Sequence, residues 1–148
     1  MKNNILLSLI AAALAGCTPR AARQAPGADS IAPGNALTGN RQIEKIIAND
    51  SVSIQPRETT PGVAQTITFA PDGFYIIATN CNSINGSYTL CGTSLRMTDG
   101  LMTEMACDNM AVENHLRHII PQINSVDFEN DSTIRLNTGG TPCIILRK

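Results

Sequence analysis

The sequence predicts a mainly β (α+β) domain, in which a strongly curved, barrel-like antiparallel sheet carries one packed α-helix over a face or an opening. Two observations lead to this fold class. A series of short segments alternates apolar with polar residues or is rich in β-branched side chains, and turn residues separate the segments. An apolar pattern with helical spacing occurs between Val112 and Ile123, which predicts one amphipathic helix.

The predicted strands follow one another closely from Leu37, where the domain begins, to the last residues of the chain. Val52 and Ile54, for example, alternate with serines, which is typical of a short half-buried strand. Strands are expected at 43–47, 52–54, 66–69, 74–81, 87–91, 95–97, 101–105, 126–129, 133–137 and 143–147, with a loop at 56–62.

Two short sequences predict β-hairpins in the middle of the chain. Pro71-Asp72-Gly73 predicts a turn, because proline presets φ and glycine accepts a positive φ. Asn85-Gly86 is the strongest short hairpin signal in the chain. The segment 87–91 is therefore expected to be the return strand of a second hairpin.

The helix has a predicted start and a predicted end. Either Asp108 or Asn109 can cap its first turn with a side-chain oxygen. Pro121 should end the regular helix one residue earlier, because proline cannot continue the hydrogen-bond ladder.

Residues 1–16 have the pattern of a secretory signal. Lys2 supplies the positive charge, and the apolar run at 5–14 is too short to span a bilayer as a stable helix. Leu14-Ala15-Gly16-Cys17 resembles a lipobox, in which the cysteine becomes the lipidated first residue. The alternative is an ordinary signal peptide followed by an incidental cysteine. We expect Cys17 to be the lipid-attachment site and the link to the membrane.

Residues 17–36 are expected to be the lipidated cysteine and a flexible tether. The segment is rich in alanine, proline and glycine and has no apolar periodicity. No acidic cluster follows Cys17, so nothing resembles a surface-export tag. We therefore expect an outer-membrane lipoprotein whose domain, 37–148, faces the periplasm.

Charge and aromatic content argue against nucleic acid as a partner. The chain has 11 basic and 12 acidic residues and a formal net charge of −1, so no excess of positive charge would attract phosphates. Aromatic residues make up 3% of the chain and tryptophan is missing, so there is no platform for base stacking. We expect a monomer that does not bind nucleic acid.

Four cysteines remain in the expected mature domain, at Cys81, Cys91, Cys107 and Cys143. In an oxidising compartment an even number favours two disulfides, and four cysteines allow three pairings. Cys81–Cys91 is one candidate, because the two could lie opposite each other across the hairpin predicted between them. The spacing matches neither a redox Cys-x-x-Cys nor a zinc module, so we expect no metal and no cofactor.

Two motifs in the second half of the domain carry a family resemblance. They are Cys81-Asn82 followed by Gly86-x-Tyr88, and Thr103-x-Met105-Ala106-Cys107 followed by Glu113. Their order and spacing resemble the META domain, a family that includes a heat-inducible outer-membrane lipoprotein of bacteria. The resemblance covers roughly 37–148 and implies a barrel-like META fold. It implies structural roles for Asn82, Gly86, Tyr88, Thr103, Met105, Ala106 and Glu113.

The resemblance also implies a Cys81–Cys107 disulfide, which leaves Cys91 to pair with Cys143. For Glu113 the implied role is a carboxylate in the first helical turn, favoured by the helix dipole and able to reach backbone N–H groups.

The chain departs from the family pattern at two positions. Asn80 stands where the family usually has glycine, a mild change because asparagine tolerates positive φ. Arg41 stands where the family often has tryptophan, which removes a large apolar anchor from the N-terminal edge of the core.

His115 and His118 share a helix face, but their spacing is not that of the zinc-protease pattern. Both lie off the apolar stripe, so we expect solvated side chains. Weak metal binding or pH sensing is the alternative. The sequence names no catalytic residue.

The sequence and the resemblance together predict a lipid-anchored envelope protein with an accessory, stress-linked binding role and no enzymatic activity. Its partner would be another envelope protein. Two alternatives stay open. One is a protein inhibitor of an envelope or host hydrolase, with the loop 57–64 as its plug. The other is a carrier of a small apolar ligand in a cavity lined by methionine and isoleucine.

Overall fold

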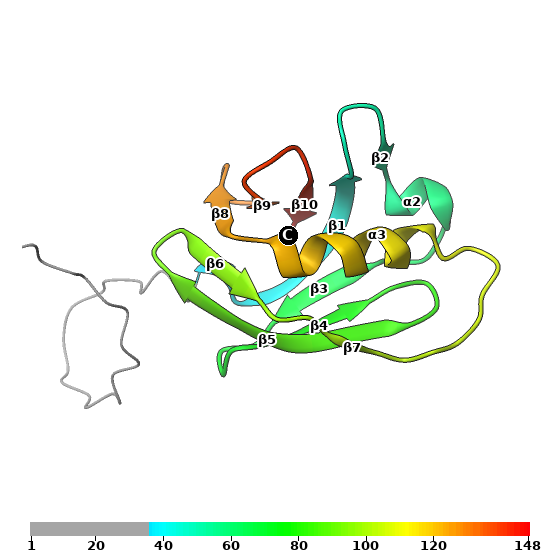
Figure 1. Cartoon of the computed structure of the whole chain (residues 1–148), viewed down its shortest axis with the longest axis horizontal. Helices are drawn as coiled ribbons and strands as arrows, with labels where there is room; N and C mark the ends of the chain where they lie inside the picture. Colours follow the sequence, from blue (N-terminus) through cyan, green and yellow to red (C-terminus); the bar gives the residue numbers. More distant parts are fainter. Residues whose placement is uncertain (1–35) are drawn as a thin grey trace, which may run out of the picture.

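Eight antiparallel strands close into a barrel in the computed structural model, which describes residues 36–148 (Figure 1). Neighbouring strands pair in the order β10-β9-β8-β6-β5-β4-β3-β1, and pairing of β1 with β10 closes the ring. Their bounds are Gly39–Ile47 (β1), Thr66–Phe69 (β3), Phe74–Ala78 (β4), Ser83–Cys91 (β5), Ser94–Met97 (β6), Ser125–Phe128 (β8), Thr133–Asn137 (β9) and Cys143–Arg147 (β10). The predicted fold class is confirmed. The predicted signal peptide, Cys17 and all but the last residue of the tether lie outside the described residues.

Two short strands and the helices complete the described part of the chain. β2 (Ser53–Ile54) pairs with the end of β1, and β7 (Leu101–Met102) pairs with β5. The helices are α2 (Pro56–Thr59), α3 (Ala111–Ile119) and the 3-10 turn η1 (Ile120–Gln122). Figure 1 shows α3 lying across the barrel, with α2 beside its first turn. No helix within residues 36–148 has the length and apolar character needed to cross a lipid bilayer.

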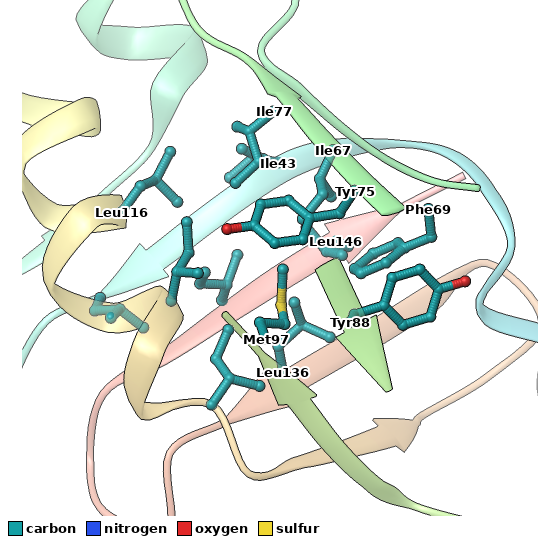
Figure 2. Close-up of a cluster of buried hydrophobic side chains, with 14 of the residues drawn as sticks. Ile43, Ile67, Phe69, Tyr75, Ile77, Tyr88, Met97, Leu116, Leu136 and Leu146 are labelled. Carbon is teal, nitrogen blue, oxygen red and sulfur yellow. The ribbon is translucent and has the colours of Figure 1, made fainter. Parts of the chain in front are cut away.

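Alternate side chains of the strands fill the barrel interior, as the alternating sequence pattern predicts. The labelled side chains in Figure 2 are Ile43, Ile67, Phe69, Tyr75, Ile77, Tyr88, Met97, Leu116, Leu136 and Leu146. The apolar face of α3 is buried on this core through Val112, Leu116 and Ile119. These side chains occupy the space that the apolar-carrier alternative would need as an open cavity.

Arg41 is buried in the barrel, at the position where the family resemblance led us to expect a large apolar anchor. Its side chain is 4% exposed, and its Nε and Nη2 donate to the carbonyl oxygens of Leu37 and Ala36 at 3.5 and 2.6 Å. Its Nη1 is buried without a hydrogen-bond partner, and burial lowers the pKa of the guanidinium. The N-terminal edge of the core is nevertheless present, because Leu37 is fully buried.

The prediction of a hairpin at Asn85-Gly86 is wrong. Both residues lie inside the continuous strand β5, and the connection from β4 is the turn at 79–82. Packing requires Gly86, because a Cβ atom there would come within 2.8 Å of the Tyr75 hydroxyl oxygen and 2.9 Å of Thr98 Oγ1. This glycine therefore marks a close approach of side chains to a strand, and no turn.

The helix start also differs from the prediction, whereas its end does not. Met110 is the N-cap residue and makes no side-chain capping hydrogen bond, so neither Asp108 nor Asn109 is the cap. The Asn109 side chain still accepts a 3.3 Å hydrogen bond from the backbone N–H of Ala111. The regular helix gives way to a 3-10 turn directly before Pro121, as proline chemistry predicts.

Two other segments differ from their predicted form. The predicted loop at 56–62 begins with the one-turn helix α2, whose first residue, Pro56, has the φ that a helix start needs. The predicted strand at 101–105 ends at Met102, because the chain then turns toward the side chain of Asn82. The strands at 66–69, 133–137 and 143–147 have their predicted bounds, and the Pro71-Asp72-Gly73 hairpin is confirmed.

Candidate functional site

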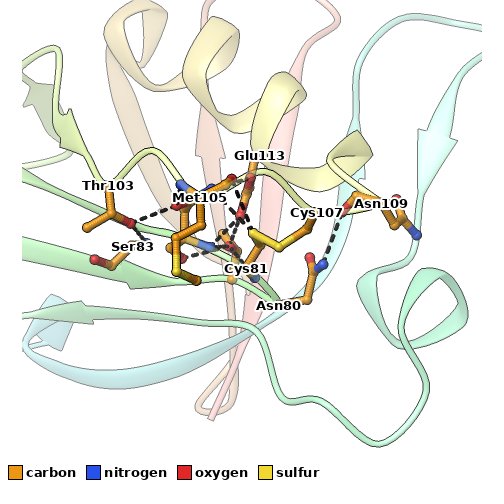
Figure 3. The surroundings of a disulfide bond; sticks show 10 residues. Asn80, Cys81, Ser83, Thr103, Met105, Cys107, Asn109 and Glu113 are labelled. Atoms are coloured by element: carbon orange, nitrogen blue, oxygen red, sulfur yellow. Dashed lines mark hydrogen bonds between the residues drawn. A yellow bond between two sulfur atoms is a disulfide. The ribbon is translucent and has the colours of Figure 1, made fainter.

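Residues of both sequence motifs meet at the turn between β4 and β5, next to the first turn of α3 (Figure 3). Thr79 holds this turn together. Its backbone N–H donates to the Asn82 carbonyl at 3.0 Å, and its Oγ1 accepts from the N–H groups of Cys81 and Asn82 at 3.3 and 3.0 Å. Threonine hydroxyls favour turns through such local hydrogen bonds. We call Thr79, Asn82, Thr103, Met105 and Glu113 the motif cluster.

Glu113 is the acidic centre of the motif cluster. Its side chain is 0% exposed. Its carboxylate accepts hydrogen bonds from the backbone N–H of Asn82 at 2.7 Å, from the Asn82 side-chain amide at 3.1 Å and from the Thr79 hydroxyl. As the third residue of α3 it also lies where the helix dipole favours negative charge. The carboxylate therefore joins α3 to the barrel through neutral donors.

The Asn82 side chain joins a third segment to the same place. Its Oδ1 accepts from the Thr103 hydroxyl and from the Met105 backbone N–H, both at 2.8 Å. Its Nδ2 donates to the Met105 carbonyl at 3.0 Å. Met105 takes part through its backbone, whereas its side chain is exposed. One buried amide thus fixes the chain that follows β7 against the start of β5.

The structure forms the Cys81–Cys107 disulfide that the family resemblance implies, with 6.2 Å between the Cα atoms. The bond lies beside the motif cluster (Figure 3). It links residues 26 positions apart, and a loop of this size stabilises the fold by about 3.5 kcal/mol in the chain-entropy account. The alternative Cys81–Cys91 pairing fails, because the hairpin that would bring those residues together does not exist.

The prediction of a second disulfide, between Cys91 and Cys143, is wrong. Cys143 is a buried free thiol, and its Sγ accepts a 3.3 Å hydrogen bond from Arg135 Nη1. Cys91 ends β5 whereas Cys143 begins β10, and β6, β8 and β9 lie between these strands in the sheet. Neighbouring strands are about 4.8 Å apart, and a disulfide needs Cα atoms within about 7 Å.

Three residues of the family motifs make no contact in the hydrogen-bond network of the cluster. Gly86 packs under the Tyr75 ring, as described above. Tyr88 belongs to the core, where its ring packs edge-on against Phe69 at 5.1 Å between centroids and its hydroxyl donates to the Ala70 carbonyl at 2.7 Å. Burial raises the pKa of Tyr88. Ala106 is exposed, between Met105 and the disulfide.

Sequence reasoning missed the roles of several residues that hold this region together. The signal for Thr79 was present, since a threonine next to two asparagines at the end of a strand favours a turn. Asn80 donates from its side chain to the Asn109 carbonyl at 3.0 Å, and Asn109 donates to the Thr59 carbonyl at 2.9 Å. This pair of contacts joins the turn, the start of α3 and α2. No local pattern in the sequence could have revealed it, because the partners are far apart in the chain.

The two helix histidines remain at the surface. His118 is exposed and His115 is half-buried, and both border a shallow hollow together with Asp99 and Arg117. Within residues 36–148, no three His, Cys, Asp or Glu side chains gather closely enough to hold a metal ion.

A second feature of the surface is an apolar channel over β5. Phe74, Ile76 and Leu101 are 58%, 53% and 78% exposed, although side chains of this kind are usually buried. They border an open hollow of about 440 Å³ that we call the β5 channel. Its lining residues are Phe74, Tyr75, Ile76, Asn85, Gly86, Ser87, Thr98, Asp99 and Leu101.

The two features differ in what they can do chemically. The motif cluster uses its polar groups internally, because Glu113 is enclosed and Cys81 and Cys107 are bonded to each other. The β5 channel presents apolar side chains to solvent, together with the side chain of Asn85 and the carboxylate of Asp99. The cluster is therefore suited to holding the fold, and the channel is suited to binding.

Comparison with known families and structures agrees with this architecture. The family model of the META domain matches residues 48–148. That range omits β1, which the barrel nevertheless needs, because β1 bridges β3 and β10. A search of curated proteins finds no match.

Solved structures share the fold at low sequence identity. An NMR structure of a protein from Burkholderia xenovorans is similar with a TM-score of 0.63 and 18% identity, over 88% of this chain and 95% of that one. A crystal structure of a DUF4847 family protein from Bacteroides vulgatus is similar with a TM-score of 0.53 and 11% identity, over 75% of this chain and 92% of that one. At these identities the likeness concerns the fold alone.

Proposed function

Because the chain belongs to the META-domain family, we propose that it is a lipid-anchored, non-enzymatic binding protein of the bacterial cell envelope. Its role would be accessory and linked to stress, as the family resemblance implies. The anchor would be Cys17, and the domain would face the periplasm from the outer membrane. The proposal for the anchor is supported by the sequence of residues 1–17, with its short apolar run and lipobox-like end.

The β5 channel is the observation that carries the binding role. Large exposed apolar patches on a soluble domain mark interaction surfaces, because leaving them in water is unfavourable. Burying Phe74, Ile76 and Leu101 under a partner would remove that cost at a rate of about 25 cal/mol per Å² of apolar area. Their position also makes them available, since they lie on the outer side of β4 and β7.

The motif cluster supports a non-enzymatic role. A general acid or base must reach its substrate, whereas the Glu113 carboxylate is fully enclosed and already accepts three hydrogen bonds. A nucleophilic thiolate must be free, whereas Cys81 and Cys107 form a disulfide. We therefore assign these residues to stability rather than chemistry.

A hydrolase inhibitor is the second candidate, because one loop has a fixed base and an exposed end. The Thr59 carbonyl accepts the hydrogen bond from Asn109, and Pro56 is buried. Val63, farther along the same loop, is 39% exposed. Such a loop could enter an active site with little loss of conformational entropy. Deleting 61–64 should abolish inhibition in this case and leave channel-dependent binding intact.

The experiment uses the full chain in its own cells, before and after heat stress. Membrane fractionation with mass spectrometry of the N-terminal peptide should find a lipidated Cys17 in the outer membrane, and Cys17→Ser should release the protein. Chemical cross-linking should join the wild-type protein to an envelope protein and fail for the double variant Ile76→Asp, Leu101→Asp. Val52→Asp changes an exposed apolar residue elsewhere and serves as the matched control. Equal cross-linking of all variants would refute the role of the channel.

A further inference from the structure

The β5 channel has a regular geometry, because its residues occupy cross-strand rows. Asn85 pairs with Ile76 on β4 and with Leu101 on β7, so an exposed polar side chain lies between two exposed apolar ones. In the next row, Phe74 pairs with Ser87. The channel thus has a polar floor along β5 and apolar side chains on both sides.

These dimensions fit an extended peptide lying along the floor. Asn85 and Ser87 are two residues apart in a strand, so the rows repeat about every 6.6–6.8 Å. Every second side chain of any extended chain repeats at the same distance. Two such side chains could therefore contact Ile76 and Phe74 in turn, while the Asn85 amide, which offers donors and an acceptor, bonds the main chain of the peptide.

The backbone of β5 restricts how a partner can bind. It already pairs with β4 on one side and with β6 and β7 on the other. A partner strand cannot extend the sheet at β5 and must lie over its outer face. Side chains, and not a new backbone ladder, would then provide the affinity and the specificity.

Charge indicates what else the partner carries. Among the described residues that line the channel, Asp99 is the one with a formal charge. It is exposed and also borders the hollow of His115 and Arg117, but neither of the two ion pairs within residues 36–148 involves it. A carboxylate beside apolar walls favours a ligand with a nearby lysine or arginine. It disfavours the anionic surface of a membrane, which attracts clusters of basic residues.

We propose that the β5 channel binds an extended segment of a partner protein that presents two aliphatic or aromatic side chains two residues apart and a lysine or arginine close to them. This inference rests on the proposed binding function and names its surface and the chemistry of its partner. The apolar side chains lie between Ile76, Phe74 and Leu101, and the cation lies at Asp99.

The test places the photo-crosslinking amino acid p-benzoylphenylalanine in the full chain, in its own cells. It replaces Asn85 on the channel floor, Asp131 in the exposed β8–β9 turn as a control, or Val63 in the candidate inhibitor loop. We expect a protein adduct from position 85 and none from position 131. Mass spectrometry should map the adduct to a segment with the predicted apolar and basic residues.

A synthetic peptide of the mapped segment then gives the quantitative test, by titration calorimetry at two salt concentrations. Ile76→Asp should weaken its binding by about tenfold or more. Asp99→Asn should weaken it about fivefold and reduce its salt dependence, whereas Asp131→Asn should change neither. Unfolding curves check that each variant is folded.

Several outcomes would overturn the inference. They are an adduct at position 85 with a lipid or with a second copy of this chain, a mapped segment without a basic residue, and binding that is unchanged by Asp99→Asn. An adduct from position 63 alone would refute the channel and leave the binding function standing. No adduct from any of the three positions would refute both.

Discussion

Glu113, in the first turn of α3, accepts a 2.7 Å hydrogen bond from the backbone N–H of Asn82, which lies 31 positions earlier. The same Asn82 holds the segment after β7 through Thr103 and Met105. Two side chains therefore join the β4–β5 turn, the segment after β7 and α3. This arrangement gives Asn82 and Glu113 of this chain the structural roles that the family resemblance implies.

Removing the Glu113 carboxylate should destabilise the domain. Glu113→Ala leaves the Asn82 N–H, the Asn82 amide and the Thr79 hydroxyl without their buried acceptor, so we expect a loss of about 3 kcal/mol in the free energy of unfolding. Glu113→Gln keeps one acceptor oxygen and should cost less. Urea unfolding measures both. Glu104→Ala, at an exposed residue between Thr103 and Met105, should stay within about 0.5 kcal/mol, and an equally small effect at Glu113 would contradict the structural role.

The disulfide next to this joint should be needed for full stability. The double variant Cys81→Ser, Cys107→Ser should lose about 3.5 kcal/mol in the free energy of unfolding, because the unfolded chain regains the entropy of an open loop. Peptide mapping under non-reducing conditions checks the connectivity and should also find Cys143 as a thiol. A peptide that joins Cys81 to Cys91 would show that the assignment is incorrect.

Local patterns predicted some parts of this fold and misled at others, for identifiable reasons. The strands at 66–69 and 133–137 have their predicted bounds, because one buried face imposes alternation on the sequence. The hairpin prediction at Asn85-Gly86 was wrong, because the dipeptide contains no information about the Tyr75 ring, which packs against the glycine from another strand. Similarly, the free Cys143 depends on the order of strands in the barrel, which cysteine spacing does not encode.

The candidate site also has a part that the sequence predicted and a part that it did not. The family motifs pointed to Asn82 and Glu113 without showing that their side chains bond each other. The β5 channel was not predicted, since its walls come from strands that are distant in sequence. The residue types of Phe74 and Leu101 do not show whether their side chains are buried or exposed. Only the register of β4, β5 and β7 reveals that they point outward.

The contact between Gly86 and Tyr75 predicts a strong effect of one added methyl group. Gly86→Ala would place its Cβ 2.8 Å from the Tyr75 ring and hydroxyl, and the displacement needed to relieve this overlap should cost about 1–3 kcal/mol. Gly140→Ala is the matched control, because the nearest atom to its Cβ would be 3.7 Å away. Thermal unfolding should show a lower midpoint for Gly86→Ala and an unchanged midpoint for Gly140→Ala. Equal midpoints would mean that the structure around β5 can shift to accommodate the added methyl group without a loss of stability.

Replacing Arg41 by an apolar residue of similar size should stabilise the domain, in contrast to the substitutions described above. Its guanidinium is buried, its Nη1 has no hydrogen-bond partner, and desolvation lowers its pKa. Arg41→Met keeps the volume of the side chain and removes the buried charge, so we expect a gain of about 1 kcal/mol in the free energy of unfolding. Arg41→Ala is the control for volume and should be destabilising, because it leaves a cavity. If both variants lose stability equally, the hydrogen bonds to Ala36 and Leu37 outweigh the cost of burial.

Tyr75 should make the free energy of unfolding decrease as the pH becomes alkaline. Its hydroxyl donates to the Thr98 carbonyl at 2.9 Å, and burial, together with the charge of Asp99, raises the pKa of the phenol from 10.0 to about 12. Above pH 10 the unfolded chain releases the proton while the folded chain keeps it. The stability that Tyr75 contributes is therefore present below pH 10 and is lost as the pH rises toward 12.

The difference in the free energy of unfolding between the wild type and Tyr75→Phe isolates the contribution of Tyr75, because other groups that titrate in the same pH range are present in both proteins. At pH 7, Tyr75→Phe should be less stable than the wild type by about 1 kcal/mol, because it lacks the hydrogen bond to Thr98. Urea unfolding between pH 9 and 11.5, a range chosen to span the onset of ionisation at about pH 10, should show this difference shrinking as the pH rises. A constant difference would mean that Tyr75 ionises equally in both states and that the phenol is less enclosed by Gly86 and Gly100 than its packing indicates.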